Sequence, residues 1–464
     1  MKNLLIIAIL LFASELFAGF GSFGLTSSRY VSQSGVGVAN PDRIYSVGLN
    51  PAGTMMIGDS SYLQFNVAFP NVSLGFNNSS FEGGDIEKYF NAENGSSKIL
   101  SVQDEDDFLN LIDGNAESFI QLRLNLFRAG IMISPKIGAF TVSIDDNVAV
   151  KSTLPKELME LAFRGNTIGR EYNFSNFEYQ ASVLRSYSLN YARPIISDSK
   201  GFIKNLNIGV GVKFVQSFGY ADFNTDYASL FTDSSAKLGL NFSGQGRSAA
   251  GDELFNEFND NEGDGFSSPF PSAGGSGIGF DIGGIAQLRN GLQLGLSITD
   301  IGTIKFDQNV DISNHSLVTL VEDLTEKEID SIADGTNKIT AMANEFDIDL
   351  PTALRFGITV PVQKFIPMLG ILNASVDVSQ GFNDNFANST NTRFAIGAEW
   401  LPFQSLPSLM AGVGNDRFNN TRFSLGLGYS IKIFDVYIGS RDFLATISGG
   451  KRASVSLNIR WKIW

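Results

Sequence analysis

Residues 453–464 read ASVSLNIRWKIW and alternate apolar with polar side chains from Ala453 to Ile463. Successive side chains of a β-strand point to opposite faces, so such a segment has one apolar face and one polar face. A soluble barrel hides its apolar face inside. A chain that repeats the pattern over long strands, without a core of the soluble type, is instead expected to turn that face towards lipid.

The same alternation recurs along the chain, with Gly, Asn and Pro at the turns. In the range 206–214, for example, Leu, Ile, Val and Phe occupy the even positions and Asn, Gly and Lys the odd ones. The pattern predicts an all-β fold, a transmembrane antiparallel barrel of about fourteen strands over residues 60–464. The predicted strands are 60–78, 117–134, 137–152, 179–194, 205–219, 276–289, 291–306, 351–362, 370–381, 391–402, 407–416, 421–431, 433–444 and 451–463.

The connections between these strands sort by length. If both ends of the barrel lie in the periplasm, the short turns fall on that side. The long connections then all fall on the outer side, as is typical of outer-membrane barrels. Helices are predicted in three of these outer loops, at 101–112, at 156–163 after Pro155, and at 317–343. The long connections are 79–116, 153–178, 220–275 and 307–350.

The composition excludes several classes of function. The chain has no Cys, one His and a formal net charge of −14. Without Cys there are no disulfides, thiol catalysis or thiolate metal sites, and the acidic balance argues against binding to nucleic acid. His315 lies beside Ser316 in a polar outer loop, where no third group is implied to orient it, and one imidazole cannot form a histidine metal centre. We therefore expect no enzyme activity, no catalytic residue and no cofactor.

Residues 1–18 have the pattern of a secretory signal peptide, with Lys2 as the positive charge, residues 4–12 as the apolar run and Ala18 at a tolerable cleavage site. An uncleaved anchor is the alternative. The expected location is the cell outer membrane, with membrane lipid, lipopolysaccharide and the barrel-insertion machinery as partners. The terminal Trp464 departs from the usual insertion signal, because it falls in the polar row of Lys462 rather than in the lipid-facing row.

Residues 19–59 precede the first strand and are small, glycine-rich and poorly periodic. A segment this apolar is not expected to hang free in the periplasm, so we place it inside the lumen as a plug. The motif Asn50-Pro51-Ala52-Gly53 supplies the expected gate residues. This motif resembles the FadL-type family of outer-membrane transporters for hydrophobic compounds, although related secretion-system barrels carry the Asn-Pro-Ala tripeptide too. The resemblance implies a fourteen-stranded barrel with an N-terminal hatch, and small hydrophobic molecules as ligands.

A second resemblance covers most of the mature chain. It rests on the segments LPKEL at 154–158, GN at 165–166, RSYSLNY at 185–191, GIGFDIG at 277–283 and GLSITDIG at 295–302. These are similar to an uncharacterised family of bacterial outer-membrane proteins defined only as a domain of unknown function. This is the better match of the two and implies no activity. The FadL-like function is therefore an analogy of fold, and a fold does not fix a function.

Charged side chains on the polar faces of the strands are the best functional candidates, because they are expected to line the lumen. The alternative is that opposite charges pair there and support the plug. Asp260, Glu262 and Asp264 have the spacing of the start of a calcium loop, but the twelfth position is Pro271 in place of a carboxylate. No other metal site is expected. The lumen candidates are Lys213, Asp281, Asp377, Glu399, Lys432 and Arg460.

Two functions remain open. The first is a passive, plugged channel for small hydrophobic molecules. The second is a non-transporting envelope scaffold or secretion accessory that binds a protein partner through its outer loops. A continuous apolar row from the loops into the lumen favours transport, whereas a lumen sealed by charges favours the scaffold.

Overall fold

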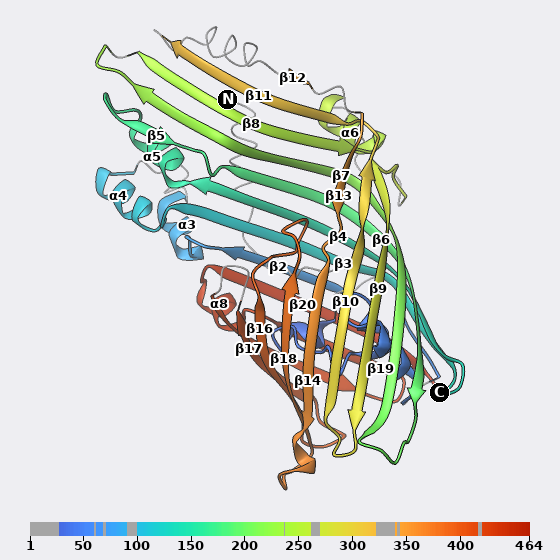
Figure 1. Cartoon of the computed structure of the whole chain (residues 1–464). Helices are drawn as coiled ribbons and strands as arrows, with labels where there is room; N and C mark the ends of the chain where they lie inside the picture. The colour runs from blue at the N-terminus through green and yellow to red at the C-terminus, as the bar shows by residue number, and fades with distance from the viewer. Residues whose placement is uncertain are drawn as a thin grey trace.

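The computed structural model (Figure 1) describes residues 27–59, 62–67, 71–90, 100–235, 237–260, 270–321, 339–340, 344–415 and 420–464. Its strands form one antiparallel sheet that closes on itself. The ring closes because the last strand, β20 (Arg452–Ile463), pairs with β1 (Leu63–Val67) and β2 (Val72–Asn78), the two parts of the first strand. Following the pairings around the ring gives fourteen strand positions, which confirms the predicted fold class.

The remaining strands of the ring each overlap one predicted range. They follow the chain order, so that neighbours in sequence are neighbours in the ring, as short connections require. They are β3 (Asn115–Ser134), β4 (Gly138–Pro155), β6 (Glu178–Ile196), β7 (Ile203–Thr232), β9 (Gly275–Leu288), β10 (Gln293–Phe306), β14 (Ala353–Pro361), β15 (Ile371–Gly381), β16 (Arg393–Leu401), β17 (Ser408–Asn415), β18 (Thr421–Ser430) and β19 (Phe434–Ser440).

The two faces of the ring have opposite polarity. On β20, the side chains of Val455 and Trp461 are 45 and 44% exposed on the outer face. Ser456, Asn458 and Arg460 point into the ring and are at most 2% exposed. An apolar outer surface around a polar interior is the arrangement of a transmembrane barrel. Among the described residues, no helix is both long and apolar enough to cross a membrane.

On the loop side the sheet extends beyond the ring (Figure 1). Strand β7 leaves β9 at Ser217 and continues to Thr232, pairing there with β8 (Leu238–Ala250), which in turn pairs with β11 (Asp311–Val321). The predicted helix at 317–343 is therefore wrong at 317–321 and at β12 (Ile339–Thr340), both of which are strand. The β-branched residues of Leu317–Val321 favour a strand, and the rest of that range lies outside the described residues. Short strands β5 (Glu171–Asn173) and β13 (Phe346–Asp349) complete this outer part.

Short helices also lie on the loop side. The α4 helix begins at Ser101, whose hydroxyl accepts from the Asp104 N–H while the Asp104 carboxylate accepts from the Ser101 N–H, a capping box. The α5 helix follows Pro155 and ends before Gly165. Both lie in ranges where the sequence predicts helices. The loop-side helices are α3 (Gly83–Phe90), α4 (Val102–Asn110), α5 (Lys156–Arg164), α6 (Asp252–Asp260) and α8 (Phe443–Ser448); η3 (Val362–Lys364) lies at a turn on the opposite side.

Residues 27–59, here called the N-terminal segment, lie inside the ring, where they are drawn in blue in Figure 1. They form α2 (Ser28–Val31) and the 3-10 helices η1 (Arg43–Ser46) and η2 (Pro51–Asp59). The α2 helix contacts β18, β19 and β20, whereas η2 contacts β4, β6, β7 and β9. The segment therefore reaches across the lumen from one wall to the other.

Candidate functional site

Eight glycines on eight strands surround the N-terminal segment. They form four cross-strand pairs, and a Cβ atom at each would press on the segment or on a side chain that holds it. At Gly209 a Cβ would overlap the backbone of Pro51 and Ala52, whereas at Gly284, on the outer face, it would meet only the Asn207 carbonyl at 3.7 Å. The wall thus has glycine, which lacks a side chain, at the positions where the N-terminal segment lies closest. This glycine ring consists of Gly209, Gly283, Gly295, Gly357, Gly397, Gly412, Gly426 and Gly439.

Hydrogen bonds join the N-terminal segment to several walls of the barrel. The hydroxyls of Ser34 and Ser424 lie 2.6 Å apart, and the Ser297 hydroxyl donates to the Leu49 carbonyl at 2.6 Å. On β15, one carboxylate oxygen of Asp377 accepts from the backbone N–H groups of Gly37 (2.6 Å) and Val38 (2.9 Å). The contact between segment and wall is therefore polar in part. Apolar side chains supply the rest, because Ile44 and Leu49 of the segment belong to a buried cluster that includes Met132 of β3.

The motif at 50–53 forms a turn within this segment. The Asn50 amide donates to the Val38 carbonyl (2.9 Å) and the Gly284 carbonyl (3.2 Å), and its oxygen accepts from the Ala52 N–H (3.1 Å). A Cβ at Gly53 would overlap the Pro41 ring. Asn50 and Ala52 are fully buried. The motif therefore folds the segment on itself and fixes it to β9.

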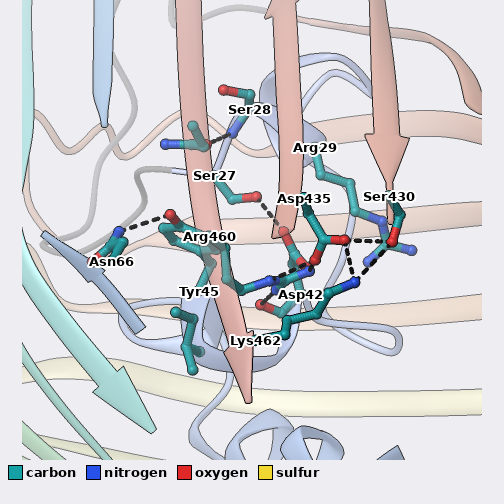
Figure 2. A network of polar contacts seen from close by, with 12 residues as sticks. Ser27, Ser28, Arg29, Asp42, Tyr45, Asn66, Ser430, Asp435, Arg460 and Lys462 are labelled. Carbon is teal, nitrogen blue, oxygen red and sulfur yellow. Dashed lines mark hydrogen bonds and ion pairs between the residues drawn. The ribbon is translucent and has the colours of Figure 1, made fainter. Parts of the chain in front are cut away.

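A buried ionic cluster ties the N-terminal segment to β19 and β20 (Figure 2). Arg460 lies between two carboxylates: its Nη1 is 2.7 Å from Asp42 of the segment, and its Nη2 is 2.5 Å from Asp435 of β19. Lys462 approaches the other oxygen of Asp435 at 2.7 Å. On the same side of the lumen, Arg29 pairs with Glu399 at 2.7 Å. Two of the predicted lumen residues, Glu399 and Arg460, thus bind the segment.

The environment of Asp42 keeps it ionised. Burial alone raises the pKa of this carboxyl, but the positive charges of Arg460 and Arg29 outweigh burial and hold the pKa below its usual value. The Ser27 hydroxyl also donates to Asp42 at 2.9 Å. The segment therefore presents a charged carboxylate to Arg460 at neutral pH.

A second ionic cluster lies on the opposite wall. Lys213 of β7 is fully buried between Asp281 of β9, at 2.9 Å, and Asp300 of β10. The pairing of β9 with β10 shifts register between Ile298 and Ile301, and Asp300 has a positive φ of 59° at this bulge. The bulge turns Asp300 into the lumen. Lys213 and Asp281 were expected to line the lumen, whereas their partner Asp300 could not be found by alternation.

One further sequence expectation is wrong, and another lies largely outside the described residues. Lys432 lies in the exposed turn after β18, where it lines the pocket at the turn side of the lumen. His315 lies within β11 rather than in a loop, with its Nε2 atom 2.9 Å from the Ser313 hydroxyl. Of the calcium-loop candidates, Glu262 and Asp264 lie outside the described residues, as does the side chain of Asp260 at the end of α6.

Above the N-terminal segment, one sector of the inner wall is apolar. Leu184, Val215, Ile304 and Phe306 belong to a buried cluster together with Phe386, which comes from the connection between β15 and β16. Residues 382–392 of this connection are here called the inward loop, because residues 386–389 at its centre are buried. The Asn388 amide, for example, donates to the Thr352 carbonyl at 2.9 Å. This inward loop could not be predicted from the sequence, because a connection of ordinary length carries no signal for its direction.

Two open pockets lie on either side of this filled region. The outer one, of about 890 Å³, is lined mostly by Ser, Thr, Asn and acidic residues, among them Glu117 and Asn224. The inner one, of about 760 Å³, is reached from the turn side and includes Glu399 and Tyr437. The lumen is thus accessible from both ends and closed in its middle by the N-terminal segment and the inward loop.

The model of a family of unknown function, DUF5723, matches residues 59–440. No curated protein sequence matches the chain. Similar solved structures include the Ralstonia pickettii toluene transporter TbuX (12% identity, TM-score 0.45, 96% of this chain and 97% of that one) and a Pseudomonas aeruginosa FadL homologue (14%, 0.42, 96% and 98%). The Pseudomonas putida toluene transporter TodX is also similar (10%, 0.42, 96% and 96%). At these identities and TM-scores, the similarities say nothing about what this chain transports or binds.

Proposed function

This chain belongs to the DUF5723 family of unknown function, and we propose that it is an outer-membrane channel closed at rest by its N-terminal segment. The channel passes small apolar or amphipathic molecules without energy input. Its apolar outer face contacts membrane lipid and lipopolysaccharide, and the lipid-facing Trp461 and Ile463 near its end are read by the barrel-insertion machinery.

The glycine ring carries this proposal. A barrel of fourteen strands is too wide for its own side chains to fill, and this wall removes side chains where the N-terminal segment sits. The material that closes the lumen is therefore a separate segment near the chain terminus. Moving this segment leaves an open ring of glycines.

The polar contact between segment and wall supports a movable closure. Hydrogen bonds and ion pairs exchange for water when the segment moves, and a buried ion pair adds little net stability once desolvation is counted. The charges that seal the lumen are thus compatible with a channel at rest, although such a seal was the feature expected of a scaffold.

The apolar sector of the inner wall defines the class of molecule. Leu184, Val215, Ile304 and Phe306 pack in one buried cluster with Phe386 of the inward loop, and the outer pocket is polar. A molecule that enters from outside meets polar groups first and an apolar surface next. Small molecules with an apolar body fit this order, and those with one polar end fit it best.

The test compares uptake across the outer membrane of Gram-negative cells that produce the full-length protein, a variant lacking residues 27–50, or neither. The probes are a hydrophobic fluorescent dye and a sugar of similar mass. The full-length protein should speed uptake of the dye, and the deletion should speed uptake of both. If neither protein speeds uptake of either probe, although both fold in the membrane, the channel proposal is wrong.

The scaffold remains a second candidate because the β7–β8–β11 sheet projects beyond the ring. Phe231 in its outer part is 39% exposed. A photocrosslinking residue at position 231 should then capture one discrete envelope protein, whereas the same residue at the lipid-facing position 455 should not. Identical products at both positions would argue against the scaffold.

A further inference from the structure

The most enclosed of the four cavities described for this structure lies between the N-terminal segment and strands β14 to β17, and it has a volume of about 50 Å³. Ser34 and Val38 of the segment line one side. Three guanidinium-bearing residues, Arg355, Arg393 and Arg441, line the rest, together with amide and hydroxyl groups of the inward loop. The lining is therefore rich in hydrogen-bond donors.

Arg355 is the central residue of this cavity. It is only 6% exposed, and its Nη1 donates to the neutral hydroxyl of Thr299. Among the described residues, no carboxylate oxygen lies within 4 Å of its guanidinium. The nearby carboxylates of Asp281 and Asp300 form ion pairs with Lys213 instead. A buried charge that has no ion-pair partner is unfavourable, because the protein interior replaces water poorly around it.

Charges of both signs surround Arg355: the carboxylates of Asp300 and Asp281 attract it from beyond ion-pair distance, and other arginines lie nearby. Arg123, 3% exposed, feels the repulsion of both Arg355 and Arg393. Asp377 is the one carboxylate among the lining residues, and one of its oxygens already accepts from two backbone N–H groups of the segment. Three arginines and one aspartate thus line this cavity, although the whole chain carries a net charge of −14. Arginine side chains around a narrow passage are a common means of binding anions.

We propose that this cavity is a binding site for one small anion, either an inorganic ion such as a halide or a single carboxylate group. The volume holds roughly three or four waters, which suits such an ion and excludes a hydrocarbon chain in the closed state. Because Arg441 also donates to the Ser34 carbonyl at 3.4 Å, a bound anion contacts the wall and lies beside the N-terminal segment. The site does not depend on the channel proposal, since it exists in the closed barrel.

The experiment uses full-length protein in detergent. Crystals soaked in bromide should show an anomalous peak inside the cavity beside Arg355, and bromide line broadening by NMR gives the dissociation constant. In Arg355→Gln the dissociation constant should rise about tenfold or more, because one charge-assisted donor group is lost. Arg289→Gln, at an exposed turn where Arg289 bonds only backbone carbonyls, should leave it unchanged.

Competition with octanoate distinguishes the two kinds of anion, an inorganic ion and the carboxylate group of a larger molecule. If octanoate displaces bromide from the closed protein and octanol does not, the site takes the carboxylate end of a larger molecule. If neither competes, it takes inorganic anions. Absence of the peak in the wild-type crystal, or equal bromide affinity of Arg355→Gln and the wild type, would overturn the proposal. If Arg355→Gln does not fold, the presence or absence of the bromide peak in the wild-type crystal decides the proposal. A failure of the transport experiment would leave the bromide result unchanged.

Discussion

Replacing Asp42 by Asn tests the attachment of the N-terminal segment most sharply. Asp42 supplies the segment's side of the ionic cluster in Figure 2, whereas Asp435 and Lys462 belong to the wall. The amide of Asn keeps the size of the side chain but removes its charge. The side chains of Asp42 and Arg460 are 5 and 2% exposed, so water screens this pair very little.

The free energy lost in Asp42→Asn depends on the ion pair that Arg460 keeps. Breaking a fully buried ion pair costs about 3–5 kcal/mol. Arg460 keeps Asp435, to which its Nε and Nη2 donate at 2.9 and 2.5 Å, so we expect about 2–3 kcal/mol. This loss makes the unseated state of the N-terminal segment roughly 30- to 150-fold more populated.

The assay is hydrogen–deuterium exchange of the backbone N–H groups of residues 28–50 in the full-length protein, followed by mass spectrometry. The matched control is Glu345→Gln, which breaks an ion pair with Lys305 whose side chains are 51 and 61% exposed. Such a surface pair contributes little to stability, because water screens the two charges. If Asp42→Asn exchanges no faster than this control, the ionic cluster does not hold the segment in place.

Three further variants or conditions use the same exchange measurement. Gly209→Ala should destabilise the seated segment by about 1–3 kcal/mol through overpacking, whereas Gly284→Ala, on the outer face, should not; equal effects would contradict the role of the glycine ring. Acid should loosen the segment: since the pKa of Asp42 is lowered in the folded state, its stabilisation is present above about pH 4 and is lost as the pH falls below that. Asp42→Asn should lack this acid response. Asp377→Asn should speed exchange at Gly37 and Val38 by about tenfold, because a neutral amide accepts more weakly than a carboxylate, and unchanged rates there would exclude this contact.

The ring itself could be predicted from the sequence, because period-two alternation has a single physical cause. In Ala453–Ile463 the side chains of one parity face lipid and those of the other face the lumen, as the burial of Ser456 and Arg460 shows. The same parity placed Lys213, Asp281, Asp377 and Glu399 on the inner face. Lys432 lies beyond the end of β18, where this parity no longer applies, and lines the pocket at the turn side.

The contents of the lumen were harder to predict. Alternating glycines such as Gly209 and Gly295 make room for the N-terminal segment, which the alternation alone does not indicate. Neither Asp42 nor Asp300 has a periodic signal: the first lies in an irregular segment, and the second is turned inward by a bulge. Partners far apart in sequence, such as Asp42 and Arg460, become visible only once the ring is closed.

The central claim, that molecules pass only when the N-terminal segment moves, is tested by locking it. The hydroxyls of Ser34 and Ser424 lie 2.6 Å apart, and the chain has no Cys of its own, so Ser34→Cys with Ser424→Cys should give a single disulfide. Uptake of the hydrophobic dye by cells with the oxidised protein should fall to the level of cells without it, and a reductant should restore it. Equal uptake before and after reduction, with the disulfide shown to have formed, would contradict the account.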